Sequence, residues 1–249
     1  MDCMDTLRLG MFQYDPVWCD AAANQQRIES LLQAAEVTDL LVFPEMTLTG
    51  FCMDASRAHL DASQHGWFAD LARSRRSGVV YGCVEQGYNR LVLLDRTGTR
   101  TGSYDKRHLF GLGGEPSTYR PGAATEAWDF EGWRIRPSVC YDLRFGYHYW
   151  ENASDIDLAL VPACWTASRE THWRSLLVAR AIENQFYVAG VNRTGEEPRI
   201  QYAGASLLVD PNGGVVRDAG SENGVFATEI FLENIRRQRA RFPFLRDRI

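Results

Sequence analysis

Short apolar runs along the chain alternate with stretches in which apolar residues recur at helical spacing. The apolar runs predict strands at 7–14, 39–43, 79–84, 91–94, 135–139, 157–161, 186–191, 204–209, 214–217 and 225–230. Helical spacing predicts one helix that begins after Asp20, a second over 64–76, and a third that Ser168 caps. Helices between strands in both halves, together with hairpin-like strand pairs, are typical of an α/β protein with mixed sheets.

Proline and glycine mark the places where regular structure is expected to break. Pro137, inside the run at 135–139, predicts a bulge or a sheet edge because proline donates no ladder hydrogen bond. The segment 111–116 contains three glycines and a proline, which predicts an irregular loop of the kind in which function concentrates. The chain shows no linker and no repeat of 20–50 residues, so we expect a single domain over 1–249.

The segment at about 232–249 is an arginine-rich tail, with six arginines among the last fourteen residues. Such a tail could contact nucleic acid or pack on a neighbouring subunit. The apolar segment 242–245 interrupts the charge, and the chain as a whole carries a net charge of −5. An acidic protein is a poor partner for nucleic acid, so we expect the tail at a subunit interface.

Composition narrows the class of protein further. Hydrophobic residues make up 45% of the chain and charged residues 24%, as in a soluble globular protein. No apolar run approaches the roughly 20 residues that cross a bilayer, and residues 1–5 lack the order of a signal peptide. The six cysteines have no CxxC spacing and the five histidines no metal-ligand spacing. We expect a cytoplasmic protein that does not associate with a membrane and binds no metal or cofactor.

Three reactive side chains are spread along the chain, and two of them follow predicted strands. Glu45 follows the run at 39–43, Cys140 follows the run at 135–139, and Lys106 stands between them in sequence. Together they would supply a general base, a thiol nucleophile and a fixed positive charge, which is acyl transfer without histidine. Lys106 and a helix beginning just after Cys140 would favour the thiolate, and Lys106 with the backbone N–H of Tyr141 would stabilise the oxyanion. Cys164 is the alternative nucleophile.

At these residues the sequence resembles the nitrilase (carbon–nitrogen hydrolase) superfamily. The resemblance is carried by segments 43–51, 104–110, 139–145, 179–185 and 192–195. It implies a four-layer α-β-β-α sandwich with two mixed sheets, one active site per subunit, and assembly into a homodimer or a higher homo-oligomer. The sequence is most similar to the omega-amidase branch. That similarity implies hydrolysis of the terminal amide of short dicarboxylate monoamides, such as 2-oxoglutaramate or 2-oxosuccinamate, with release of ammonia.

The resemblance also implies roles for residues near the triad. Glu115 would position the lysine and the substrate, although its position also fits a solvated loop carboxylate. Arg144 would bind the free carboxylate of the substrate through its planar fork, unless it forms a salt bridge with Asp142. Trp165 would form a wall of the pocket or part of the core. Gly146 stands where the family commonly has proline, which would relax the chain just beyond Arg144.

Other functions are compatible with the same residues. An aliphatic amidase, an N-carbamoyl amide hydrolase or a nitrilase would use the same triad, because the shape of the pocket decides among them. A non-catalytic scaffold would keep the fold alone, and the intact Glu45, Lys106 and Cys140 argue against it. The expected partner is therefore a small-molecule amide.

Overall fold

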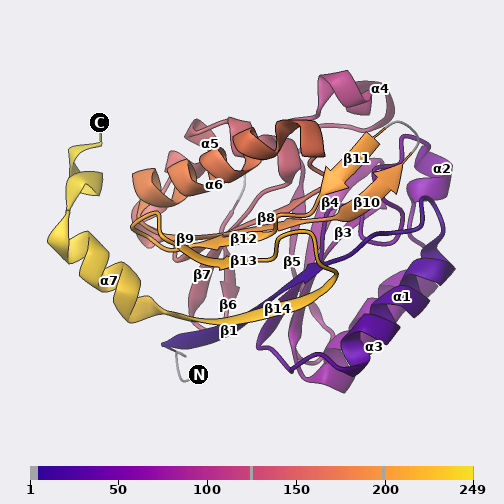
Figure 1. Cartoon of the computed structure of the whole chain (residues 1–249), viewed down its shortest axis with the longest axis horizontal. Helices are drawn as coiled ribbons and strands as arrows, with labels where there is room; N and C mark the ends of the chain where they lie inside the picture. Colours follow the sequence, from indigo (N-terminus) through magenta and orange to yellow (C-terminus); the bar gives the residue numbers. More distant parts are fainter. Residues whose placement is uncertain (1–4, 124–125, 198–199, 249) are drawn as a thin grey trace.

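Two six-stranded sheets lie at the centre of the molecule, and helices cover their outer faces (Figure 1). The computed structural model describes residues 5–123, 126–197 and 200–248. One outer layer contains α1 (Ala21–Gln33) and α3 (Ala62–Arg75), and the other contains α5 (Tyr147–Trp150) and α6 (Glu170–Asn184). The result is the four-layer α-β-β-α sandwich that the resemblance implies.

The first sheet has the strand order β14-β1-β2-β3-β4-β5. Its strands are β1 (Thr6–Gln13), β2 (Leu40–Val42), β3 (Gly78–Glu85), β4 (Tyr88–Leu94), β5 (Arg100–Asp105) and β14 (Gly224–Phe231). The first three run parallel, whereas β14 lies antiparallel beside β1 and returns the chain to its start. All three residues of β2 are buried, which is why this parallel strand reads as a continuous apolar run in the sequence.

The second sheet has the order β13-β12-β9-β8-β7-β6 and is also mixed. Its strands are β6 (Trp128–Phe130), β7 (Trp133–Pro137), β8 (Leu158–Ala163), β9 (Tyr187–Asn192), β12 (Leu207–Val209) and β13 (Val215–Asp218). Pro137 is the last residue of β7 and lies beyond the stretch that pairs with β6. The missing N–H of the proline therefore breaks no hydrogen bond to β6. β7 is an interior strand between β8 and β6, and its pairings contain no bulge, so the proline is accommodated at the strand end.

Shorter elements connect the layers. The remaining α-helices are α2 (Ala55–Ala58), α4 (Glu115–Thr118) and α7 (Leu232–Arg241), and β10 (Thr194–Glu197) pairs with β11 (Ile200–Ala203) in a separate hairpin. The 3₁₀ turns are η1 (Gly111–Gly113), η2 (Cys140–Arg144), η3 (Ala153–Asp155), η4 (Ala167–Arg169) and η5 (Phe244–Asp247). In Figure 1, α7 and the segment after it extend to one side of the sandwich. No helix among the described residues is long and apolar enough to cross a membrane.

Two apolar clusters hold the layers together. The larger one includes residues from both sheets together with the fully buried Trp133 and Trp173. The smaller one packs α1 and α3 on the first sheet, where the rings of Phe68 and Tyr81 stack 3.8 Å apart. Burial of apolar surface is the dominant favourable term in folding, so these clusters hold the two sheets to each other and the helices α1 and α3 to the first sheet.

Two local expectations are wrong, and the edge strand β5 was not predicted. Ser168 does not cap α6, because it lies inside η4, where its hydroxyl pairs with that of Thr166 (3.1 Å), and the helix begins at Glu170. The segment 111–116 is regular in part, since it contains η1 and the start of α4, with Pro116 in the first helical turn, where proline is tolerated. The edge strand β5 was missed because most of its residues are exposed or half-buried, which removes the apolar signal.

Candidate active site

Four strand ends meet where the two sheets approach each other. Glu45 and Cys140 follow β2 and β7, whereas Lys106 and Cys164 directly follow β5 and β8. The backbone amide of Cys164 donates to Glu45 Oε2 (2.8 Å) and thereby joins the two sheets at this point. The four side chains are therefore carried by short connections on a rigid frame, which is how precise sites are built.

The charged centre of the site is closed to solvent. Lys106 Nζ contacts Glu45 Oε1 at 2.8 Å and Glu115 Oε2 at 2.7 Å, and all three side chains have 0% exposure. The amide of Asn89 donates to both carboxylates, at 2.8 Å each. Burial acts to lower the pKa of Lys106, but the two carboxylates outweigh it and hold that pKa above its usual value. The ammonium is thus a permanent positive charge.

Glu115 is part of this centre and not a solvated loop carboxylate. It begins α4, and its Oε2 accepts hydrogen bonds from Lys106 and from the amide of Phe110 (2.6 Å). Burial raises the pKa of Glu115 even though Lys106 acts in the opposite direction. The structure therefore contradicts the alternative that Glu115 is a solvated carboxylate on a loop.

Cys140 stands on a tight turn at positive φ (45°) and is 8% exposed. Burial and the carboxylate of Glu45 raise the pKa of its thiol well above the usual value, although Lys106 acts to lower it. The helix that was expected to favour the thiolate is only the five-residue η2, and burial together with Glu45 acts against ionisation of the thiol, whose pKa is raised. A neutral thiol beside a carboxylate must lose its proton as it attacks.

The turn that carries Cys140 is fixed by Asp142. Its carboxylate accepts from the amide of Val139 (2.9 Å), the hydroxyl of Tyr104 (2.7 Å) and the ring Nδ1 of His108 (2.7 Å). Burial acts to raise the pKa of Asp142, but the hydrogen bond from His108 and its other partners hold it below the usual value. The carboxylate is fully engaged, so the salt bridge to Arg144 that we considered is absent.

A cavity of about 1100 Å³ opens above Cys140. Tyr141, Arg144, Cys164 and Trp165 line it together with Cys140. Trp165 is 4% exposed, so it is both a wall of this cavity and part of the core. The guanidinium of Arg144 lies 4.7 Å from the centre of the Trp165 ring and 5.9 Å from that of Tyr141. The cavity thus has a thiol at its base and a cation on its wall.

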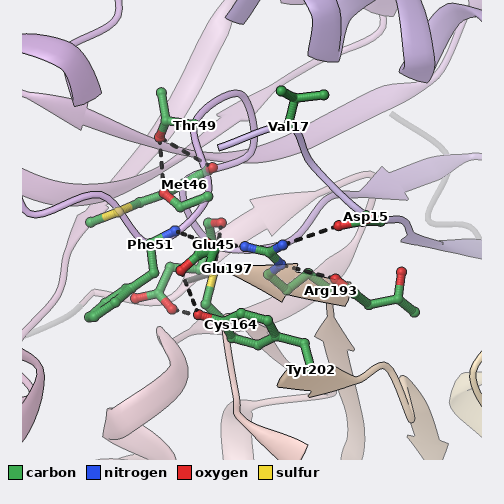
Figure 2. A network of polar contacts seen from close by, with 12 residues as sticks. Asp15, Val17, Glu45, Met46, Thr49, Phe51, Cys164, Arg193, Glu197 and Tyr202 are labelled. Atoms are coloured by element: carbon green, nitrogen blue, oxygen red, sulfur yellow. Dashed lines mark hydrogen bonds and ion pairs between the residues drawn. The ribbon is translucent and has the colours of Figure 1, made fainter. Parts of the chain in front are cut away.

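One wall of the cavity is the β10–β11 hairpin, which a buried ion pair holds in place. Figure 2 shows Glu197 between Arg193, the Tyr202 hydroxyl (2.9 Å) and the backbone amide of Phe51 (3.2 Å). The fully buried side chain of Arg193 also pairs with Asp15 (3.2 Å). Gly50 fits this arrangement because its φ is +67° and a Cβ there would lie 2.7 Å from Glu197 Oε1. The hairpin is therefore tied to the loop that follows Glu45.

The structure brings all the candidate residues of the sequence together. Glu45, Lys106, Cys140 and Glu115 form the buried centre, while Tyr141, Arg144 and Trp165 line the cavity. Sequence reasoning missed Asn89, which bridges the two glutamates, and Glu197, which holds the hairpin. Asn89 lies just before the predicted strand at 91–94, in a segment interpreted as a turn, so no sequence pattern marked it.

The described side chains do not suggest a metal centre. Within residues 5–123, 126–197 and 200–248, no group of three or more His, Cys, Asp or Glu side chains is arranged to hold a metal ion. His108 is engaged with Asp142 and with the hydroxyl of Tyr147 (2.5 Å).

Comparisons with known proteins agree with this geometry. The carbon–nitrogen hydrolase family matches residues 8–240. The omega-amidase YafV of Yersinia enterocolitica is 39% identical over 253 residues, covering 98% of this chain and 97% of that protein. The 2-oxoglutaramate amidase of Bacillus subtilis is 30% identical over 253 residues, covering 96% of both chains. XC1258 of Xanthomonas campestris, a CN-hydrolase superfamily protein solved with an arsenic adduct in its active site, has a TM-score of 0.92 and 34% identity, covering 99% of this chain and 98% of that chain.

Proposed function

The chain belongs to the nitrilase (carbon–nitrogen hydrolase) superfamily, in its omega-amidase branch, and from that premise we propose which amide it hydrolyses and how. It is a hydrolase that acts on amides. We propose that its substrates are short dicarboxylate monoamides of the 2-oxoglutaramate or 2-oxosuccinamate type. The reaction passes through an acyl-thioester on Cys140 and releases ammonia.

The first half-reaction forms the thioester. The Cys140 sulfur attacks the amide carbonyl while Glu45 takes the thiol proton, which fits the raised pKa of the thiol. Lys106 and the backbone N–H of Tyr141 stabilise the oxyanion of the tetrahedral intermediate. When the C–N bond breaks, the leaving nitrogen receives the proton from Glu45 and departs as ammonia.

The second half-reaction returns the enzyme to its starting state. Glu45 takes a proton from water, which attacks the thioester carbonyl. The C–S bond then breaks, the carboxylic acid forms, and the departing sulfur of Cys140 receives the proton from Glu45. Both half-reactions need Glu45 in one orientation. Lys106 and Asn89 donate to its Oε1, and the backbone amide of Cys164 donates to its Oε2. These three hydrogen bonds fix the orientation of the carboxylate. Glu115 contacts the ammonium of Lys106 and acts as a positioning residue for it.

The substrate class rests on Arg144. Its guanidinium faces the cavity, contacts two aromatic rings and lies 3.4 Å from His172 Nδ1, and no carboxylate within residues 5–123, 126–197 and 200–248 forms an ion pair with it. A cation left without a carboxylate inside a cavity of this kind favours an anionic ligand group. A monoamide of a dicarboxylic acid places a carboxylate there and its amide over Cys140.

We also propose a setting for the enzyme: a single domain over 1–249, in the cytoplasm, that works as a homodimer or a higher homo-oligomer with the tail at about 232–249 in the interface. The described cysteines are free thiols, as a reducing compartment favours. The exposed rings of Phe242 and Phe244 in the tail support an interface. The molar mass in solution, with and without residues 242–249, tests this arrangement.

Ammonia release from a panel of compounds tests the function. The panel contains 2-oxoglutaramate, succinamate, butyramide, an aliphatic nitrile and an N-carbamoyl amine. We expect the highest kcat/KM for the two carboxylate-bearing amides. A preference for butyramide would favour an aliphatic amidase, and a preference for the nitrile or carbamoyl compound would favour the other activities of the superfamily. Absence of turnover throughout would favour the scaffold.

A further inference from the structure

A second arginine faces the same cavity as Arg144 and has no assigned role. Arg169 ends η4, is half-buried, and lines the cavity together with Cys140. Arginines on the following helix are paired: Arg174 with Glu170 and Asp218, and Arg180 with Glu183. For Arg169, by contrast, no carboxylate in the described ranges 5–123, 126–197 and 200–248 lies within ion-pair distance.

Aromatic rings hold Arg169 next to the catalytic centre. Its guanidinium lies 5.2 Å from the centre of the Phe110 ring. The backbone amide of Phe110 donates a hydrogen bond to Glu115. The carbonyl of Arg169 accepts from the indole N–H of Trp165 (2.8 Å). The Phe110 and Tyr141 rings lie 5.1 Å apart. The Phe110–Tyr141 ring pair therefore lies between the two cations, with Arg169 over Phe110 and Arg144 near Tyr141.

The acidic side chains of the cavity do not neutralise these two cations. Glu197 is engaged with Arg193, and Glu196 is exposed at the rim. Glu45 and Glu115 are bound to Lys106 beneath the cavity. One carboxylate of a substrate would balance Arg144 and leave Arg169 without a partner. A ligand that engages both cations needs a second acceptor group besides its carboxylate.

We propose that Arg169 is a specificity-determining residue that, together with Arg144, recognises a 2-oxo carboxylate; this proposal rests on the proposed amidase function. A 2-oxo acid presents a ketone oxygen and a carboxylate oxygen side by side on adjacent carbons. The planar guanidinium fork of arginine can donate to two such oxygens at once. Arg144 binds the carboxylate of any monoamide, whereas Arg169 adds its contact only when the 2-oxo group is present.

The test compares 2-oxoglutaramate with glutaramate, which lacks only the 2-oxo group. The wild-type enzyme should prefer 2-oxoglutaramate, and Arg169→Met should reduce that preference in kcat/KM by roughly 10–200-fold, the range expected for hydrogen bonds to a charged group. Arg169→Lys keeps the charge but loses the fork, so its loss of preference should be smaller. Arg144→Met should lower kcat/KM for both substrates. Arg217→Met is the matched control, because Arg217 lies 5.5 Å over the Phe226 ring but does not line the cavity.

Inhibition by products gives a second measurement that does not depend on turnover of each substrate. 2-Oxoglutarate should inhibit the wild type more strongly than glutarate, and Arg169→Met should remove that difference. Equal losses on both substrates would overturn the proposal, because Arg169 would then act as a general attractor of anions. An unchanged preference in Arg169→Met would overturn it as well. Both results leave the amidase function intact, whereas a wild type that hydrolyses neither monoamide would instead refute the proposed function.

Discussion

The buried centre around Lys106 and the cavity wall around Arg144 differ in how their charges are paired. In the centre, one ammonium contacts two carboxylates and an amide bridges them, all out of contact with solvent. On the wall, two guanidiniums lie against aromatic rings, and neither has a carboxylate partner among the described residues. Side chains that are already paired are held in fixed positions for the reaction, whereas an unpaired cation is available to bind an anionic ligand. Under the proposed function, this difference separates the chemistry at the centre from the selection of the substrate at the wall.

The largest expected effect is on Cys140, the proposed nucleophile. Cys140→Ala should abolish ammonia release on the best wild-type substrate, because no thioester can form. The fold should persist, since this change removes only a sulfur atom beside the cavity. Circular dichroism and ammonia release measure the two outcomes. Cys164→Ala is the comparison variant, and loss of turnover there with retention in Cys140→Ala would transfer the role to Cys164.

The next effect concerns the charge at the centre. Lys106→Met should lower kcat by roughly 10²–10³-fold or more, by analogy with the loss of other oxyanion donors. It also leaves two carboxylates facing each other, so the thermal unfolding midpoint must be measured beside the rate. Glu115→Gln keeps the ammonium and should have a smaller effect on kcat. A rate close to wild type in a folded Lys106→Met variant would place the chemistry elsewhere.

The cavity wall should respond differently from the centre. Arg144→Met should lower kcat/KM for 2-oxoglutaramate or succinamate by roughly 10–200-fold, because hydrogen bonds to a charged group contribute ~1.5–3 kcal/mol. Butyramide has no carboxylate, so its kcat/KM should fall much less. The ratio between these substrates is the informative measurement. Equal losses on both would mean that Arg144 only supports the turn that carries Cys140.

The smallest expected effect is at Gly146, just beyond the wall. Its φ and ψ are −53° and −39°, and Phe145 before it is extended, a combination that proline accepts. A Cβ there would meet Arg180 Nη1 at an ordinary 3.4 Å. Gly146→Pro should therefore raise the free energy of unfolding by about 0.4–1 kcal/mol, because proline lowers the conformational entropy of the unfolded chain. The thermal midpoint should rise by a few degrees, and a fall would show that the chain needs glycine there.

Local patterns were sufficient to predict most of the fold. The apolar runs at 39–43 and 157–161 correspond to β2 and β8, and Asp20 caps α1 by accepting from the amide of Ala23 (3.0 Å). These features depend on residues that are neighbours in sequence, so periodicity and capping chemistry reveal them. The polar edge strand β5 has no such signal, because half of its residues are exposed and need no apolar side chains.

The residues of the candidate site were identifiable from the sequence, but their partners were not. The motifs around Glu45, Lys106 and Cys140 could be read from the chain, yet Lys106 and Glu45 meet across 61 positions. Whether Glu115 was solvated or buried, and whether Asp142 paired with Arg144 or with His108, depended on which segments the two sheets bring together. Ion pairs form through space and burial sets their strength. Tertiary structure alone therefore decided which charges are paired inside the protein and which remain available to a ligand.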